Sequence, residues 1–153
     1  MRDLAATAQG GTATPIGSCF DRLAAIEAYP DWYPAGVKQA EALERGPDGE
    51  LTKVKATLAL AQGPIQRDFM LHFAVRLERP RWIELRRVPK TPDDQELIVI
   101  TWRLTERGAQ ATALEIALEA KLDVPRFLPV GAIAGGIANG FMDAALASFA
   151  NAP

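Results

Sequence analysis

The sequence predicts one α+β domain, residues 1–153, in which about seven antiparallel strands pack against a long C-terminal helix. Apolar and polar residues alternate with a period of two from Val37 to Val124, as in strands with one buried face. A helical pattern follows over residues 127–150, and a short amphipathic helix precedes the alternation. Consecutive strands flanked by helices are typical of α+β folds rather than of parallel sheets.

The composition argues against several classes of protein. The net charge of −2 lacks the basic excess of nucleic-acid binders, so no nucleic-acid partner is expected. Cys19 is the only cysteine, so no internal disulfide forms, and the single histidine, His72, argues against a metal site. We expect no cofactor. Residues 1–11 lack the apolar stretch of a signal peptide, so a cytoplasmic location is expected.

The N-terminal part predicts a strand followed by one or two short helices. The strand is expected at residues 3–9, ended by Gly10-Gly11. The helix is expected to start with Thr14 as N-cap and Pro15 at the first helical position. Its buried stripe comprises Cys19, Phe20, Leu23 and Ile26. The prolines of Tyr29-Pro30-Asp31-Trp32-Tyr33-Pro34 then allow at most a short helical turn.

Six further strands are expected, joined by short turns into an antiparallel meander. They span residues 37–45, 51–61, 67–78, 82–88, 97–105 and 111–122. Glycine or proline marks each intervening turn, at residues 46–49, 62–64, 79–80, 89–94 and 107–108.

The alternation assigns an inner face to the strands. In segment 97–105 the inner side chains are Ile98, Ile100, Trp102 and Leu104. Segment 82–88 leaves two readings open. If Ile83 and Leu85 face inward, so does Arg87, which then needs an acidic or ligand partner. Alternatively, a register slip at Pro89 returns Arg87 to solvent.

The C-terminal helix is rich in small residues. Gly135, Gly136 and Gly140 each weaken a helix by about 0.8–1 kcal/mol relative to alanine, roughly 3 kcal/mol together. Close packing on the sheet and room for a ligand are two compatible reasons for this cost. A membrane span is a third reading, but Asp143 would cost about 2.5–3.5 kcal/mol near a bilayer centre. Transient contact with a membrane remains compatible with the sequence.

Four local stretches carry a family resemblance, and with the order of elements they cover nearly the whole chain. They are Phe20-Asp21-Arg22-Leu23, the Tyr-Pro corner at residues 29–34, Trp102-Arg103-Leu104 before Gly108, and Leu128-Pro129. In these features the chain resembles the START-like helix-grip (SRPBCC) superfamily, specifically its bacterial polyketide cyclase/dehydrase and coenzyme-Q-binding-like branch. The resemblance implies a curved sheet that grips the C-terminal helix around an apolar cavity. Members of the superfamily bind lipids, quinones, polyketides or plant hormones, and a minority catalyse cyclisation or dehydration.

An apolar cavity has an energetic consequence. A pocket of about 300 Å³ would cost on the order of 7 kcal/mol if empty, at about 24 cal/mol per Å³. We therefore expect any large cavity to be occupied by ligand or water, or to be collapsed without them. An interior solidly filled by the protein's own side chains would argue against a carrier.

The expected ligand-lining residues are inward apolar side chains of the strands and the last helix. They are Phe69, Leu71, Phe73, Trp102, Leu104, Ile116, Leu118, Ile133, Ile137 and Phe141. Candidates for polar contacts with a ligand are Arg87, Asn139 and Asp143, the last two with solvation or capping as the alternative. Trp32 either guards the cavity mouth or fills the core. His72 is expected at the surface and Cys19 as a buried, inert thiol, so no catalytic residue is assigned.

The expected function is binding or transport of a small hydrophobic ligand such as a lipid, a quinone or a polyketide-like aromatic. The alternative is a polyketide cyclase, aromatase or dehydratase acting in the same cavity, which needs acid–base groups within hydrogen-bond reach of the ligand. Few polar side chains are expected to point inward, and this favours binding. A third reading is an adaptor that binds another protein through the sheet edge or the last helix. The sequence identifies no such partner.

Overall fold

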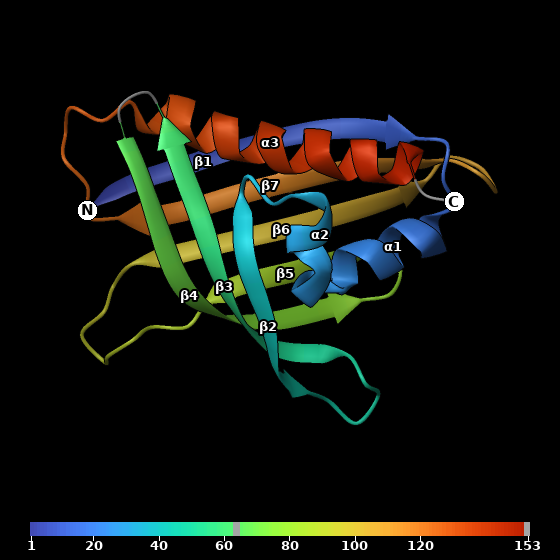
Figure 1. Cartoon of the computed structure of the whole chain (residues 1–153), viewed down its shortest axis with the longest axis horizontal. Helices are drawn as coiled ribbons and strands as arrows, with labels where there is room; N and C mark the ends of the chain where they lie inside the picture. Colours follow the sequence, from blue (N-terminus) through green and yellow to red (C-terminus); the bar gives the residue numbers. More distant parts are fainter. Residues whose placement is uncertain (63–64, 152–153) are drawn as a thin grey trace.

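The computed structural model describes residues 1–62 and 65–151 and contains the expected seven strands (Figure 1). Part of the turn expected at 62–64 therefore lies outside the described residues. The elements are β1 (Arg2–Thr12), α1 (Ile16–Ala24), η1 (Ile26–Ala28), α2 (Tyr29–Trp32), β2 (Val37–Arg45), β3 (Leu51–Gln62), β4 (Ile65–Glu78), β5 (Trp82–Arg87), β6 (Leu97–Glu106), β7 (Thr112–Leu122) and α3 (Val130–Ala150).

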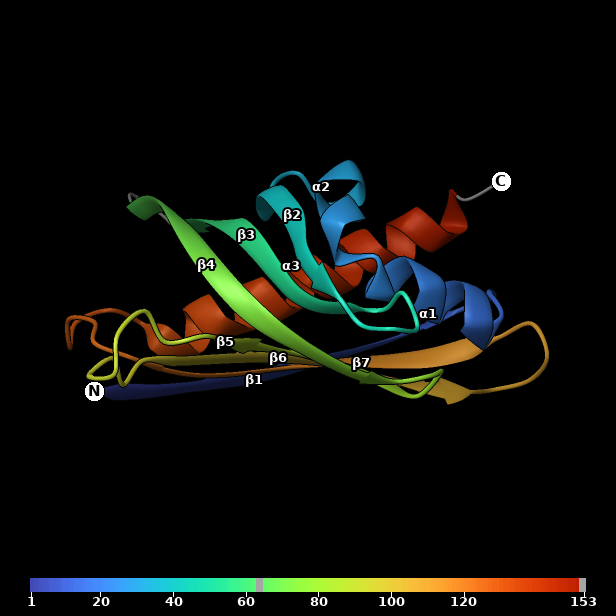
Figure 2. The same cartoon turned by 90° about the horizontal axis from the view of Figure 1, so that it is seen from below.

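All strands form one antiparallel sheet in the order β1-β7-β6-β5-β4-β3-β2. The pairing of β2 with β3 carries register shifts, and such bulges bend and twist a strand pair. Figure 2 shows the result: β2, β3 and β4 curve away from the plane of the other strands, and α3 lies on the concave side with α1 and α2. The expected antiparallel sheet curved around the C-terminal helix is confirmed.

Helix α3 packs mainly along β1 and also contacts β7. Gly10 of β1 permits this approach, because a Cβ atom there would lie 2.6 Å from Leu146 Cδ1 of α3. By length and mean hydropathy α3 also passes as a membrane-spanning helix. Its buried face of Ile133, Ala134, Ala138, Phe141, Met142, Ala145 and Phe149 gives its apolar composition a role within the fold.

The inner faces expected from the alternation are confirmed. Ile100, Trp102 and Leu104 are buried, and Ile98 packs against the same core. In β5, Ile83, Leu85 and Arg87 are all buried, so the inward register is correct and the slip at Pro89 does not occur.

Two helix starts differ from expectation. Helix α1 begins at Ile16 with Pro15 at the N-cap, and Thr14 makes no capping bond. Instead Thr14 Oγ1 lies 2.9 Å from Thr12 Oγ1, and the Thr14 carbonyl accepts a hydrogen bond from Thr112. Helix α3 begins at Val130 rather than 127, because Pro129 disfavours helical geometry at the residue before it.

Candidate functional site

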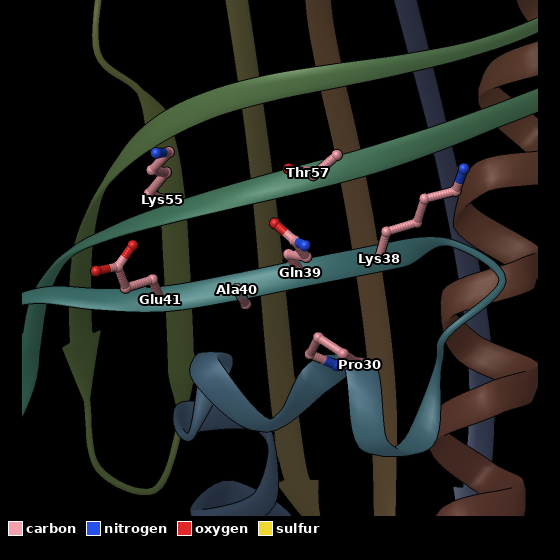
Figure 3. Close-up of a pocket in the computed structure, with 7 residues that line it drawn as sticks. All are labelled: Pro30, Lys38, Gln39, Ala40, Glu41, Lys55 and Thr57. Atoms are coloured by element: carbon pink, nitrogen blue, oxygen red, sulfur yellow. The ribbon is translucent and has the colours of Figure 1, made fainter.

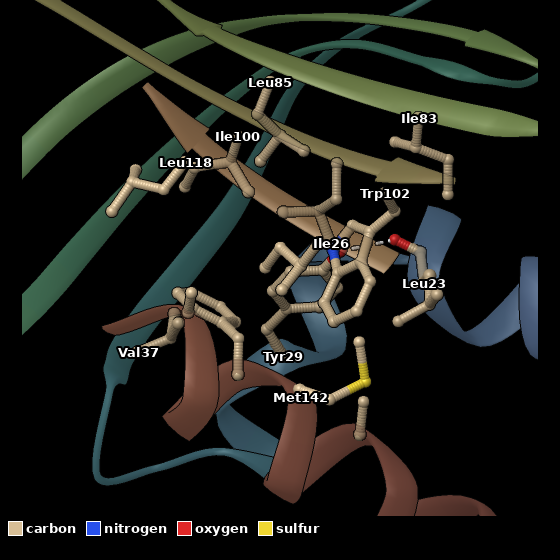
Figure 4. Close-up of a cluster of buried hydrophobic side chains, with 14 of the residues drawn as sticks. Leu23, Ile26, Tyr29, Val37, Ile83, Leu85, Ile100, Trp102, Leu118 and Met142 are labelled. Atoms are coloured by element: carbon tan, nitrogen blue, oxygen red, sulfur yellow. Dashed lines mark hydrogen bonds between the residues drawn. The ribbon is translucent and has the colours of Figure 1, made fainter. Parts of the chain in front are cut away.

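The centre of the grip is a small apolar space between the sheet and α3. Nearly every surrounding element contributes to its wall, so the site is defined by long-range packing rather than by one motif (Figure 4). The lining residues are Ile26, Tyr29, Val37, Ala56, Leu58, Phe73, Leu85, Ile100 and Phe141.

The volume of this space is about 10 Å³, about what one water molecule requires. Ligand pockets typically start near 300 Å³. Among residues 1–62 and 65–151, the centre of the grip therefore holds no space of ligand size. A filled interior is the observation expected to argue against a carrier, so a ligand could bind here only if the closed grip is the collapsed form and widens. At about 24 cal/mol per Å³ the remaining space costs only about 0.2 kcal/mol, so the closed form carries no appreciable packing defect.

Two of the ten expected lining residues, Phe73 and Phe141, border the space. Six others are buried around it without touching it: Leu71, Trp102, Leu104, Ile116, Leu118 and Ile133. Phe69 and Ile137 are partly buried against the core. The alternation predicts which way a side chain faces, but the position along a strand that meets the centre depends on the curvature of the sheet.

The lining residues missed from the sequence include Ile26 and Tyr29, which come from η1 and α2 rather than from the sheet. Their signal was present in the helical stripe that ends at Ile26 and in the Tyr-Pro corner. Val37, Leu58 and Ile100 were also missed as lining residues, although their inward parity was readable.

Tyr29 supplies the only titratable group among the lining residues. It is buried, and its hydroxyl donates a 2.6 Å hydrogen bond to the Leu23 carbonyl. Burial raises the pKa of Tyr29 well above its ordinary value, the neighbouring Trp102 N–H lowers it in part, and the Glu27 carboxylate adds to the rise. The phenol therefore stays neutral, and its proton is donated to the backbone carbonyl of Leu23.

Two half-buried aromatic rings cover the side of the space that faces α2 and α3. Tyr33 meets Phe141 edge-on with ring centroids 4.9 Å apart, and Trp32 lies 4.8 Å from Tyr29. Tyr33 also sits directly over Gly36 and Gly140, where a Cβ atom would collide with its ring or its hydroxyl. On this side the space is therefore covered partly by a side chain, Tyr33, that rests on glycines, and a side chain moves more easily than packed backbone.

Arg87 is buried and paired within the chain rather than with a ligand. Its Nη2 lies 2.6 Å from Asp94 Oδ2, and its Nη1 donates to the Glu96 carbonyl at 3.0 Å. The guanidinium beside it holds the pKa of Asp94 well below its usual range, helped by the backbone N–H groups of Lys90 and Glu96. Arg87 thus fastens the β5–β6 loop.

The other two candidates for polar ligand contacts point away from the interior. Asn139 and Asp143 are exposed on the outer face of α3. Burial raises the pKa of Tyr33, and the Asp143 charge raises it further, so Asp143 acts on the covering ring and not on the space. His72 is exposed on β4, as expected.

Cys19 is buried in α1, also as expected. Burial raises the pKa of its thiol, which disfavours the reactive thiolate. Within residues 1–62 and 65–151, no group of three or more potential metal ligands is present.

A larger groove of about 370 Å³ lies outside the grip, along β2 and β3 beside Pro30 of α2 (Figure 3). Polar side chains form most of its wall: Lys38, Gln39, Glu41, Lys55 and Thr57. Lys38 is paired with Asp68 at 2.9 Å. An open, charged groove suits water better than an apolar molecule, so its greater volume does not make it the better hydrophobic site.

No protein-family model matches the chain, and no curated protein matches it in sequence. Solved structures do match it. A START superfamily protein from Mycobacterium smegmatis has a TM-score of 0.81 at 18% identity, covering 96% of this chain and 97% of that chain. The aromatase/cyclase Zhui from a Streptomyces species has a TM-score of 0.69 at 15% identity, covering 97% and 94% of the two chains.

Human STARD10 has a TM-score of 0.67 at 14% identity, covering 97% of this chain and 64% of that chain. At these identities the similarity shows the fold alone. The chain has a START-like helix-grip fold, and the expected architecture is confirmed.

Proposed function

We propose that this protein binds a small hydrophobic ligand, such as a lipid, a quinone or a polyketide-like aromatic, between the sheet and α3. The observation that carries the proposal is the wall at the centre of the grip, which is apolar apart from the committed Tyr29 hydroxyl. Because the closed space holds about 10 Å³, binding requires the grip to widen.

The energy of widening is within reach of a hydrophobic ligand. A space of about 300 Å³ would cost on the order of 7 kcal/mol if it stayed empty. Each ligand methylene transferred from water gains about 0.8 kcal/mol, so about ten buried carbons offset that cost. The protein is then closed by default and opens only with a ligand of sufficient apolar surface.

The most accessible route runs past Tyr33 and Trp32. Both rings are half-buried and lie between solvent and the lining residues Tyr29 and Phe141. Tyr33 rests on the backbone of Gly36 and Gly140, which have no side chain to hold the ring in place. Rotation of Tyr33 away from α3 would uncover Phe141 without breaking any pairing of the sheet.

Binding is favoured over the alternative of a cyclase, aromatase or dehydratase. Proton transfer needs a positioned acid or base near the reacting atoms. Among the lining residues only Tyr29 titrates; its raised pKa keeps it a neutral phenol, which is a weak acid and supplies no phenolate base, and its proton is already donated to Leu23. The similarity to the aromatase/cyclase Zhui is one of fold alone, so it does not favour catalysis.

The test compares two alanine-to-leucine variants of β3 in uptake of the neutral fluorescent probe N-phenyl-1-naphthylamine. Ala56 and Leu58 of β3 line the space, so Ala59, the next residue along the strand, lies on the opposite face. Wild type and Ala59→Leu are expected to bind the probe with a blue-shifted emission. Ala56→Leu is expected to weaken binding roughly tenfold, because its added carbons occupy the small space at the centre.

Circular dichroism and thermal melting show whether each variant is folded. Equal uptake by a folded Ala56→Leu variant would contradict the proposed site, and no uptake by the wild type would contradict the proposed function. Native mass spectrometry of freshly purified protein then identifies any ligand that copurifies.

A further inference from the structure

The interior contains an indole N–H without a hydrogen-bond partner. Trp102 is completely buried, and its Nε1 has no acceptor among the residues that the structure describes. A buried donor left unpaired is unusual and destabilises the fold. The other polar group nearby, the Tyr29 hydroxyl, donates its own proton to Leu23.

The position of this N–H relates it to the proposed ligand site. Trp102 lies on β6 two residues after Ile100, which lines the space, and its ring meets Phe141 edge-on at 6.5 Å. Figure 4 shows the indole nitrogen beside the hydrogen bond between Tyr29, a further lining residue, and Leu23. The N–H is close enough to the Tyr29 hydroxyl to lower its pKa, as a hydrogen bond would, but the pair does not reach the geometry of a full hydrogen bond.

We propose that the Trp102 N–H is the polar recognition point of the site, and that the preferred ligands are apolar molecules carrying one hydrogen-bond acceptor, such as a ketone or quinone carbonyl. This inference rests on the proposed function, because it names the ligand class of the same interior site. In the widened grip a carbonyl oxygen beside Ile26 and Tyr29 would accept the N–H. A pure hydrocarbon would leave the donor unpaired.

The chain also contains matched tryptophans. Trp82 donates its N–H to Glu78 at 3.1 Å on the exposed side of the sheet, so it is a control that has a partner. Among the described residues Trp32 Nε1 is also buried without a partner, but the Trp32 ring lies with Tyr33 over the space rather than at its centre. An experiment that observes the three indole N–H groups separately therefore distinguishes a ligand bound at the centre, near Trp102, from one bound near Trp32.

The test measures binding of fluorene and 9-fluorenone, which share ring size and shape but differ by one carbonyl. The ratio of their affinities is determined for the wild type, Trp102→Phe and Trp82→Phe, so the difference in their solubilities cancels between proteins. Loss of one net hydrogen bond is expected to reduce the preference for fluorenone about fivefold in Trp102→Phe. Trp82→Phe is expected to keep the wild-type ratio.

A measurement on the wild type guards against a Trp102→Phe variant that fails to fold. A ¹H–¹⁵N spectrum resolves the three indole N–H groups, which Trp32→Phe and Trp82→Phe assign by elimination. Fluorenone is expected to shift the Trp102 indole proton downfield, and fluorene is not. An unchanged affinity ratio in a folded Trp102→Phe variant, or a fluorenone shift at Trp32 instead, would overturn the inference.

The outcomes also distinguish this inference from the function on which it rests. If the wild type binds both probes with the same affinity ratio as a folded Trp102→Phe variant, the ligand class is wrong and the hydrophobic site stands. If it binds neither, the proposed function fails and the recognition point fails with it.

Discussion

Arg87 is a buried charge on the inner face of β5 that is balanced within the chain. Period-two alternation in β5 placed it on the inner face with Ile83 and Leu85, and a buried guanidinium requires an acceptor. The partner, Asp94, lies in the β5–β6 loop, where its carboxylate also accepts from the backbone of Lys90 and Glu96. The need for a partner followed from periodicity, but its identity depended on a loop conformation that periodicity does not encode.

Replacing Asp94 with asparagine tests this pair. Asp94→Asn is expected to lower the free energy of unfolding at pH 7 and to loosen the β5–β6 loop, because Arg87 stays buried without a counter-charge. The matched control is Asp68→Asn, whose partner Lys38 is half exposed, and exposed pairs contribute little. Urea unfolding of the three proteins measures the difference.

The pair also predicts a pH dependence with a definite sign. The pKa of Asp94 is depressed in the folded state, from an ordinary value of 3.8. Its contribution is therefore complete above about pH 5 and is lost as pH falls below 3.8, where the unfolded chain binds the proton first. The stability gap between wild type and Asp94→Asn should narrow from pH 5 to pH 3. A constant gap would contradict the assigned role.

At the scale of elements, the glycines of α3 are present for different structural reasons. A Cβ atom at Gly135 would meet nothing within 4 Å, whereas one at Gly140 would collide with the Tyr33 hydroxyl. Close packing therefore explains Gly140, the first of the two reasons considered from the sequence. At Gly135, by contrast, no side chain that the structure describes fills the space beside the helix.

Alanine substitutions in α3 separate the two cases. Gly135→Ala is expected to raise the free energy of unfolding by about 0.8–1 kcal/mol, the helix propensity of alanine over glycine. Gly140→Ala is expected to lower it by about 1–2 kcal/mol, since displacing Tyr33 outweighs the same propensity gain. Tyr33→Phe should recover part of the loss, because the hydroxyl is the nearest atom. Thermal and urea unfolding measure each effect, and equal stabilisation by both alanines would contradict the close contact.

Elements were predicted better than their ends. The strand β2 was expected at 37–45 and spans Val37–Arg45, because alternation and turn residues both mark it. The starts of α1 and α3 were expected too early, with Thr14 as N-cap and at residue 127, whereas each helix begins directly after a proline, Pro15 or Pro129. Proline marks the vicinity of a helix start, but whether it occupies the cap or the first turn depends on what the adjacent polar groups contact.

At the scale of the whole molecule, the volume of the interior was beyond the sequence. Small residues in α3 indicated room for a ligand, but the closed space amounts to about 10 Å³. The volume left at the centre is the small difference between the space that the curved sheet and α3 enclose and the volume of the side chains that point into it. Tyr29 and Tyr33, which help to fill or cover it, come from the Tyr-Pro corner, and periodicity does not predict how that corner is oriented. Helix-grip architecture was therefore predictable, whereas the degree of closure was not.

This closure leads to a prediction about kinetics. If the Tyr33 ring covers the route to the interior, Tyr33→Ala is expected to speed association of N-phenyl-1-naphthylamine roughly tenfold, because binding no longer waits for the ring to move. Dissociation should accelerate as well, so that the affinity changes less than either rate. Stopped-flow fluorescence measures both rates.

The matched control is Phe127→Ala, which removes an exposed aromatic ring just before the other end of α3. It is expected to leave both rates unchanged. Faster association in Phe127→Ala with no change in Tyr33→Ala would move the access route to the N-terminal end of α3. The closed grip would then open between that end and the sheet, and the glycines beneath Tyr33 would serve packing alone.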